Sequence, residues 1–565
     1  MTSDLVYIIL FLLALVGLAV PLGLYMGRVF AGGRTFMSVL VRPVERLTYR
    51  VCGVDEQQEM SAGQYALAFG LFFAASLVFL LLLQMLQRLL PLNPQGLPGV
   101  RWDTALNTAI SFATNTNWQS YSGEATMSYL TQMLGLAVQN FVSAGAGMAA
   151  AVAMVRGFSR KETATVGNFW VDLNRAVLYV LLPLSLIYAV LLVSQGVVQT
   201  FHSYATVTTL EGARQTIALG PAASQVAIKQ LGSNGGGFFN ANSAHPLENP
   251  TFFTNLLECL ALLLIPTAMV FAFGRLTNNR RQAWALFWAM MLLFLLGLSV
   301  ALRAESRGNP LLARAGVENG LNLEGKETRF GITQSVLWAQ STTVTSNGAV
   351  NSMHDSQTPL TGLVYMFNMG IGEVIFGGVG VGLMGMLFYV ILTMFIAGLM
   401  VGRTPEFMGK KLGPYEMVMS VIGLLSGPVA LLVGTAVAVI TAPGLAGLNN
   451  PGAHGLSEIL YAFSSAVGNN GSAYAGLSVN TPFYNVSLGL AMLVGRFATI
   501  LPGLAIAGAL ARKKTVPQSI ATFPTTGVLF TVMLIAVIVV VGALTYFPAF
   551  ALGPLLEHLT LFGGR

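Results

Sequence analysis

The tetrad Gly232-Ser233-Asn234-Gly235 indicates the fold, because related tetrads recur three more times along the chain. Each follows a mildly apolar stretch that is too short to cross a bilayer and has the length of a re-entrant helix. The third residue is always Asn, and the fourth is Gly except in the first copy. Intervals of 117, 113 and 123 residues between these Asn residues indicate an internal repeat. The other tetrads are Asn115-Thr116-Asn117-Trp118, Thr345-Ser346-Asn347-Gly348 and Gly468-Asn469-Asn470-Gly471.

The composition requires a bilayer as solvent. The 565 residues are 54% hydrophobic and only 9% charged, with a mean hydropathy of +0.69. Soluble domains carry about 25% charged residues. Runs of about 20 apolar residues, enough to cross a bilayer, predict ten spans. They lie at 5–27, 63–87, 126–154, 174–195, 253–274, 282–302, 363–400, 416–441, 484–510 and 525–548.

The seventh run is too long for one straight span and contains seven glycines between positions 370 and 385. We interpret it as one interrupted helix, with two short spans as the alternative. The prediction is an all-α membrane protein with ten transmembrane helices, in which four pseudo-symmetric helix–pore loop–helix repeats are flanked by one extra helix at each end. The predicted units are 1–62, 63–160 (repeat 1), 161–276 (repeat 2), 277–404 (repeat 3), 405–512 (repeat 4) and 513–565.

The basic residues predict the orientation. The net charge of +7 comes from 29 lysines and arginines, most of which cluster in five short linkers. Short cytoplasmic loops collect basic residues, so we place these linkers in the cytoplasm and both termini outside. The clusters begin at Arg28, Arg156, Arg275, Arg403 and Arg512.

The four short stretches lie in external linkers, at 103–114, 224–231, 333–343 and 457–467. They are predicted to be pore helices. Short polar residues at their starts favour N-caps. The expected caps are Asp103, Ser224, Thr333 and Ser457.

The tetrads suit a cation filter. Irregular backbone is tolerated at membrane depth only where it is buried in protein or lines a watery path. Four glycine-containing loops around an axis can present carbonyl oxygens that replace the hydration shell of potassium. The carbonyl ends of the short helices would add a favourable dipole for the cation. We therefore predict that all four tetrads bind K⁺, with Trp118 replacing the usual Gly in the first.

The chain resembles the family of potassium-binding A subunits of the Kdp potassium-transporting ATPases (KdpA), within the superfamily of potassium transporters. The resemblance covers essentially the whole chain. It is carried by TNTNWQSY (114–121), LGSNGGGFFNANSAHPLENP (231–250), TTVTSNGAVNSMHDS (342–356) and SSAVGNNGSAY (464–474).

This resemblance implies a non-catalytic subunit that captures potassium from outside. A separate P-type ATPase subunit (KdpB) would use ATP and Mg²⁺, and KdpC and KdpF would complete a complex in the bacterial inner membrane. The ion would leave sideways, through a tunnel into KdpB. The family's filter glycines carry over to Gly235, Gly348 and Gly471, and Gln119 carries over as a residue that supports the filter.

Charged residues inside the predicted spans mark the gate or tunnel, because intramembrane charges usually face a cavity or a partner. Glu373 in the seventh run and Arg496 in the ninth are expected either to pair below the filter or to lock two helices together. The glycines after Glu373 are expected to form a flexible gate loop or a close helix contact. These glycines are Gly377, Gly378 and Gly380.

Four further expectations concern other ionisable residues. Glu258 is expected at the membrane interface. Lys229 is expected to face outward or to pair with an acid. Asp103 and Glu124 are expected either to attract cations at the outer mouth or to serve as caps and loop contacts. No two histidines have metal-ligand spacing, and all are expected in loops: His202, His245, His354, His454 and His558.

Three other functions fit the sequence less well. A stand-alone, channel-like potassium transporter would share the four repeats, but the extra terminal spans and the long loop strings argue against it. A catalytic pump subunit or a transferase is disfavoured, because the sequence has no DKTGT-like string and no phosphate-binding G-x-x-x-x-G-K-[ST] loop. A passive scaffold would not require four matched loops.

Overall fold

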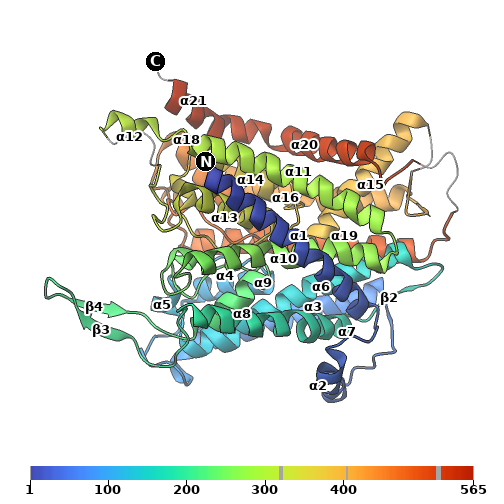
Figure 1. Cartoon of the computed structure of the whole chain (residues 1–565), viewed down its shortest axis with the longest axis horizontal. Helices are drawn as coiled ribbons and strands as arrows, with labels where there is room; N and C mark the ends of the chain where they lie inside the picture. Colours follow the sequence, from blue (N-terminus) through green and yellow to red (C-terminus); the bar gives the residue numbers. More distant parts are fainter. Residues whose placement is uncertain (1, 317–321, 403–404, 517–522, 564–565) are drawn as a thin grey trace.

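The computed structural model describes residues 2–316, 322–402, 405–516 and 523–563, so Arg403 lies outside the described residues. The chain forms a bundle of long helices (Figure 1). Within the described ranges, ten helices are long and apolar enough to span a membrane. The prediction of an all-α fold with ten spans is therefore confirmed.

Most spans are single helices, and three contain irregular turns. The continuous ones are α1 (Thr2–Phe30), α3 (Ala62–Met85), α10 (Phe252–Leu276), α11 (Arg280–Glu305), α16 (Pro414–Ile440) and α19 (Pro482–Ala511). A π-helical turn (Thr131–Ala137) leads into α6 (Val138–Ser159), and another (Ala176–Leu181) joins α7 (Phe169–Arg175) to α8 (Leu182–Ser194). The last span consists of α20 (Val528–Phe550), a turn (Ala551–Leu555) and α21 (Leu556–Gly563).

The third span starts later than the predicted residue 126. The chain remains extended at Met127, and the hydroxyl of Ser128 accepts a 3.2 Å hydrogen bond from the backbone N–H of Thr131. Ser128 thus satisfies a donor that the first helical turn leaves unpaired. Because apolar residues lie on both sides of this helix start, hydropathy alone does not locate the start of the third span.

The seventh span is interrupted, as predicted. Helix α14 (Pro359–Gly370) ends at its glycine, and α15 (Val381–Val401) begins only after residues 371–380. Four residues of this segment have left-handed backbone conformations, which no regular helix can contain. They are Gly372, Glu373, Phe376 and Gly377, and Gly380 at the end of the segment also has a positive φ.

The four pore helices are α4 (Trp102–Ala113), α9 (Ala222–Leu231), α13 (Gly331–Val344) and α18 (Gly452–Gly468). All start before the predicted positions, so the prediction of side-chain N-caps was wrong. The observed N-cap residues are Arg101, Pro221, Phe330 and Pro451, and none of their side chains caps the helix. The predicted caps lie inside the helices, and three of them have other partners. The Ser457 hydroxyl, for example, donates to the carbonyl of Ala453 at 3.1 Å.

Short elements connect these helices. Three antiparallel strand pairs are β1 (Met60–Ser61) with β2 (Thr165–Gly167), β3 (Ala205–Thr208) with β4 (Arg214–Ile217), and β5 (Glu406–Phe407) with β6 (Lys410–Lys411). The short helices are α2 (Ser38–Cys52), α5 (Gly123–Thr126), α12 (Pro310–Arg314) and α17 (Ala442–Leu445), with 3₁₀ turns at Gln87–Leu89, Asn242–Ala244 and His354–Ser356. Both chain ends lie toward the side of the bundle that carries β3 and β4 (Figure 1, left).

The interior of the bundle is built on α6 and α10, whose most apolar windows are each 83% buried. Helix α16 is the opposite case, with 11% of its window buried. Its outward residues, such as Val429 and Val433, are apolar, as required of a surface in contact with lipid or with another membrane protein. Helix α1 packs along α10 at Gly23, where a Cβ atom would lie 2.6 Å from the Cβ of Phe271.

We predict that Gly23→Val destabilises the protein, because any side chain at this position collides with α10. Overpacking of a tight contact costs about 1–3 kcal/mol, which thermal unfolding of the detergent-purified protein measures. Gly17→Val, in the same helix, is the matched control, because a Cβ at Gly17 meets no atom within 4 Å. Equal midpoints for the two variants would contradict the close packing of α1 on α10.

Candidate functional site

The loops that follow the four pore helices meet in a closed ring. A side chain on Gly235 of the second loop would collide with the backbone of Gly348 in the third. A Cβ on Gly348 would lie 2.7 Å from the carbonyl carbon of Gly471 in the fourth loop, and one on Gly471 would collide with the Thr116 carbonyl of the first. Asn117 of the first loop closes the ring by donating from Nδ2 to the Gly235 carbonyl at 3.2 Å.

The structure shifts the alignment of the first repeat by one residue. The N–H groups of Asn234 and Gly235 both donate to the Lys229 carbonyl, five and six residues earlier. In the first repeat, the residues with this relation are Thr116 and Asn117, which both donate to the Ser111 carbonyl.

The expectation that Trp118 occupies the glycine position was therefore wrong. Asn117 occupies it, with φ of 55° against 85° for Gly235. Asn is one of the few residues besides Gly that tolerate this left-handed conformation. Asn117 has the same residue type as the third residue of the other tetrads, and matching it to them by type places Trp118 at the glycine position.

Within three of the four tetrads every second residue has a left-handed conformation, and in the second loop Gly236 follows with a positive φ as well. These pairs are Asn115 and Asn117, Ser233 and Gly235, and Asn469 and Gly471, and the third loop has Ser346. This alternation distinguishes the segments from an ordinary β-strand, in which every residue has a negative φ. The four loops touch one another through Gly235, Gly348, Gly471 and Thr116.

Asparagine side chains brace each loop against its neighbour. Asn347 Nδ2 donates to the Lys229 carbonyl of the second repeat at 3.1 Å. Asn470 Nδ2 makes the equivalent bond, 2.8 Å long, to the Thr342 carbonyl of the third repeat. Lys229 and Thr342 each lie five residues before the Asn of their own tetrad, so the two braces are related by the repeat.

Gln119 and Trp118 hold the first loop from behind. Gln119 Nε2 donates to the Gly237 carbonyl at 3.0 Å, and its Oε1 accepts from the Gly237 N–H at 2.9 Å. This two-point contact joins the first loop to the second. The buried Trp118 donates from Nε1 to the Ser120 hydroxyl at 3.2 Å, and its carbonyl accepts from the Ser111 hydroxyl.

Lys229 is fully buried behind the second loop and forms an ion pair with Glu248. Its ammonium also donates to the Gly236 carbonyl at 3.0 Å. The expectation that Glu258 lies at the membrane interface was wrong, because Glu258 is fully buried and accepts from Gln230 at 2.8 Å and Ser243 at 2.9 Å. Sequence reasoning also missed Glu248, whose only signal was its place in the LGSNGGGFFNANSAHPLENP string.

The outer-mouth candidates have local partners. Asp103 lies in the first turn of α4, where Arg101 donates to it at 2.8 Å and Asn485 at 3.0 Å. Glu124 accepts a 2.9 Å bond from the backbone N–H of Asn240. Both acids therefore make loop contacts, which was one of the two expectations.

Residues 371–380 lie beneath the third and fourth loops. Glu373 is buried, and its carboxylate accepts from Asn470 Nδ2 at 2.7 Å and from the Ser346 hydroxyl. The Gly377 N–H donates to the carbonyl of Val344, the last residue of α13, at 2.9 Å. A Cβ on Gly378 would lie 2.9 Å from the Ser346 side chain.

Arg496 is not the partner of Glu373, so the predicted ion pair is absent between these two described residues. The guanidinium of Arg496 donates to the Ser143 carbonyl of α6 at 2.9 Å. It lies near Gly147, and a Cβ on Gly380 would collide with the Gly147 carbonyl. Glu373 thus contacts the third and fourth loops. Arg496 contacts α6 instead, and Gly380, at the end of the segment 371–380, also packs against α6.

A cavity of about 50 Å³ adjoins this segment, a volume large enough for ordered water by the usual threshold of about 10–15 Å³. Ser346, Gly468 and Asn469 of the third and fourth loops line one part of it. Glycines and apolar residues of α15 and α16 line another, including Gly385, Gly423 and Gly427. The cavity therefore extends from the base of the loops toward α16.

Comparisons with known proteins agree with one another. The family model described as "Potassium-transporting ATPase A subunit" matches residues 9–559. Proteins named "Potassium-transporting ATPase potassium-binding subunit" are 56% identical to this chain in Sorangium cellulosum (98% of each chain) and in Rhodospirillum centenum (100% of this chain and 99% of the relative). The crystal structure of the potassium transporter TrkH from Vibrio parahaemolyticus has the same fold, with a TM-score of 0.53 at 15% identity over 86% of this chain and 96% of that one.

We predict that Glu248→Gln destabilises the protein by about 3–5 kcal/mol, because it leaves the ammonium of Lys229 buried without its counter-charge. Thermal unfolding of the purified protein measures the loss. Glu211→Gln, in an exposed turn, is the control. The double variant Lys229→Met/Glu248→Met should recover much of the stability, and failure of this recovery would show that Glu248 acts through contacts other than the pair.

Proposed function

The chain belongs to the family of potassium-transporting ATPase A subunits, and we propose that it captures potassium in the ring of four loops and passes it to a separate ATPase subunit. The observation that carries this proposal is the closed ring of glycine contacts, from Gly235 through Gly348 and Gly471 to the first loop. Such a ring places four similar segments of bare backbone around one axis. Carbonyl oxygens in that arrangement replace the water shell of a potassium ion.

The filter would consist of the residues at and just before the ring. In the structural alignment they are the carbonyl groups of Asn115, Thr116 and Asn117 and of their equivalents in the other three tetrads, with Gly235, Gly348 and Gly471 at the level of Asn117. Gln119 and Trp118 would support the first loop. The amide braces from Asn347 and Asn470 keep the loops from collapsing when an ion leaves.

The pump-subunit function is preferred over a stand-alone, channel-like transporter. The family match extends from residue 9 to residue 559 and so includes the first and last spans, which a four-repeat transporter does not need. The similarity to TrkH, at 15% identity, supports the fold and says nothing of the pump. The chain is a non-catalytic subunit, so ATP and Mg²⁺ would act on its ATPase partner.

The finer placement is also part of this proposal. The partners would be the KdpB, KdpC and KdpF subunits, in the bacterial inner membrane with both termini outside. Glu373, Gly377, Gly378, Gly380 and Arg496 would line the gate. The cavity between the loops and α16 lies where an ion would leave sideways, and α16 presents an apolar outer face that a membrane subunit could cover.

We predict that Gly235→Ala abolishes discrimination between potassium and sodium. Gly235 has φ of 85°, and a Cβ there collides with the Gly348 backbone, so the second and third loops must separate. The measurement is the stimulation of ATP hydrolysis by K⁺ and by Na⁺ in the assembled complex.

Gly70→Ala in α3 is the matched control for Gly235→Ala, because a Cβ there meets no atom within 4 Å. Full discrimination between K⁺ and Na⁺ in an assembled complex that carries Gly235→Ala would contradict the filter proposal. Loss of assembly in the variant is detected separately, by co-purification of the ATPase subunit.

We also predict that Arg496→Ala weakens potassium-stimulated ATP hydrolysis, because the variant removes a buried cation that holds α19 to α6 beside the interrupted span. Arg303→Ala, at the exposed end of α11, is the control. Unchanged transport and ATPase activity in Arg496→Ala would remove this arginine from the mechanism.

A further inference from the structure

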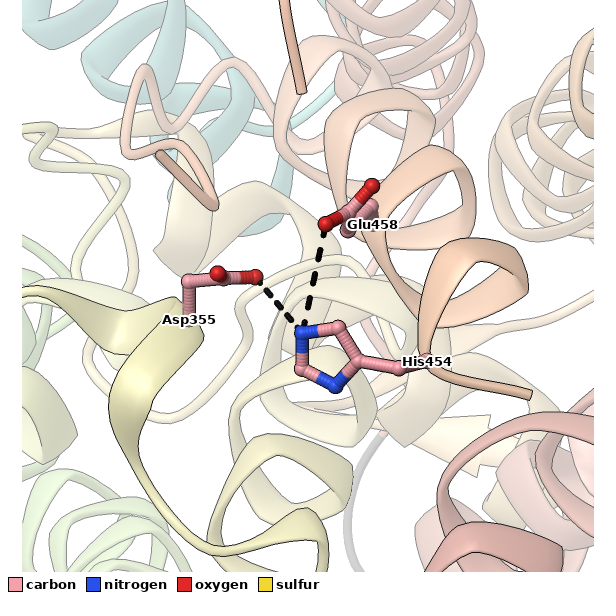
Figure 2. Close-up of side chains that lie close together, drawn as sticks. All are labelled: Asp355, His454 and Glu458. Carbon is pink, nitrogen blue, oxygen red and sulfur yellow. Dashed lines mark hydrogen bonds and ion pairs between the residues drawn. The ribbon is translucent and has the colours of Figure 1, made fainter. Parts of the chain in front are cut away.

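Three potential metal ligands from two distant parts of the chain meet at the start of the fourth pore helix. Figure 2 shows one nitrogen of the His454 imidazole facing a carboxylate oxygen of Asp355 and one of Glu458. Its Nε2 lies 2.9 Å from Asp355 Oδ1 and 4.0 Å from Glu458 Oε1. The three ligand atoms lie within 4.8 Å of one another. His454 and Glu458 are one turn apart on α18, and Asp355 belongs to the turn His354–Ser356 that follows the third loop.

A fourth group orients the histidine. Nδ1 of His454 lies 2.7 Å from Glu557 Oε1 on α21. A neutral imidazole carries one N–H, and a carboxylate beside Nδ1 places it there. The lone pair of a neutral Nε2 would then face carboxylate oxygens of Asp355 and Glu458, and either a proton or a metal ion at Nε2 removes this repulsion.

Glu458 is a buried carboxylate, and Oε1 is its oxygen nearer to His454 Nε2 (Figure 2). Its side chain is fully buried, and Oε1 accepts a 2.6 Å hydrogen bond from Asn450. Its Oε2 accepts none of normal geometry from the described residues. A buried carboxylate with an unsatisfied oxygen is costly unless it is paired with a proton, a cation or a metal.

We propose that Asp355, His454 and Glu458 bind a divalent transition-metal ion, with Zn²⁺ the best match. One imidazole nitrogen and two carboxylate oxygens are ligands that zinc prefers, whereas calcium and magnesium select oxygen ligands alone. Glu557 takes the place of the carboxylate that orients most metal-binding histidines. An adjoining pocket of about 370 Å³, lined by Asp355, His454 and Glu557 among others, supplies an entry path and room for water as a fourth ligand.

Without metal, a proton takes the same position. That proton lies in the 2.9 Å hydrogen bond between His454 Nε2 and Asp355. A metal ion competes with it for Nε2, so the apparent affinity for the metal rises with pH. The bound ion would tie the start of α18 to the segment after the third loop.

The test is metal binding by the full-length chain in its purified complex, after treatment with a chelator. Titration with Zn²⁺ against a fluorescent zinc indicator should show one equivalent bound, and Co²⁺ in its place should give the visible absorption of a tetrahedral nitrogen–oxygen site. Both signals should be lost in His454→Ala and in Glu458→Gln. Glu557→Gln should keep the site and weaken binding by about 10–100-fold.

His202→Ala, which removes a histidine of an exposed loop, is the matched control and should bind as the unaltered chain does. Absence of the cobalt spectrum in the unaltered chain, or zinc binding that survives His454→Ala, would overturn the proposal. Should His454→Ala fail to fold, the cobalt spectrum of the unaltered chain and the affinity of Glu557→Gln still decide, since Glu557→Gln retains all three ligands.

Discussion

Four stretches of non-helical backbone meet inside this membrane protein, and the need to pair their polar groups organises the structure around them. In a bilayer interior, each unpaired backbone group costs several kcal/mol. The chain meets this need with side-chain amides, chiefly those of Asn115, Asn117, Asn347 and Asn470, which donate to carbonyls of the neighbouring loop or pore helix. Each carbonyl oxygen has two lone pairs, and those that the amides leave free can serve an ion. The asparagines of the tetrads are thus cross-braces, and the glycines beside them allow the braced loops to touch.

The buried charges of Lys229 and Glu373 are also paired, either with an opposite charge or with hydrogen-bond donors. Lys229, a cation close to a proposed cation site, is neutralised by Glu248 and donates to the carbonyl of Gly236, the residue after the second tetrad. Glu373 is bound by Asn470 and Ser346, so it links the interrupted seventh span to two of the four loops. A conformational change in that segment would act on the loops directly, because Glu373 contacts Asn470 and Ser346 without an intervening residue.

Much of this architecture could be predicted from the sequence. Apolar runs located the ten spans, the glycines marked the break in the seventh, and the tetrads located the four loops. The wrong predictions concerned the surroundings of single residues. Asp103, Ser224, Thr333 and Ser457 had the residue types of helix caps, but the helices start earlier. Glu258 was placed at the interface by its distance from a span end, whereas hydrogen bonds from Gln230 and Ser243 hold it in the interior.

The sequence by itself determined the class of protein, the number of spans and the repeated loop, because hydropathy and short motifs act over a few residues. Only the tertiary structure decided which residues face one another. It put Asn117 rather than Trp118 at the glycine position, separated Arg496 from Glu373, and joined Asp355 to His454 and Glu458. The last two outcomes depend on contacts between segments 99 to 353 residues apart, and a linear pattern does not record the distances between such segments. Asn117 was placed by its backbone hydrogen bond to Ser111, which residue types alone do not reveal.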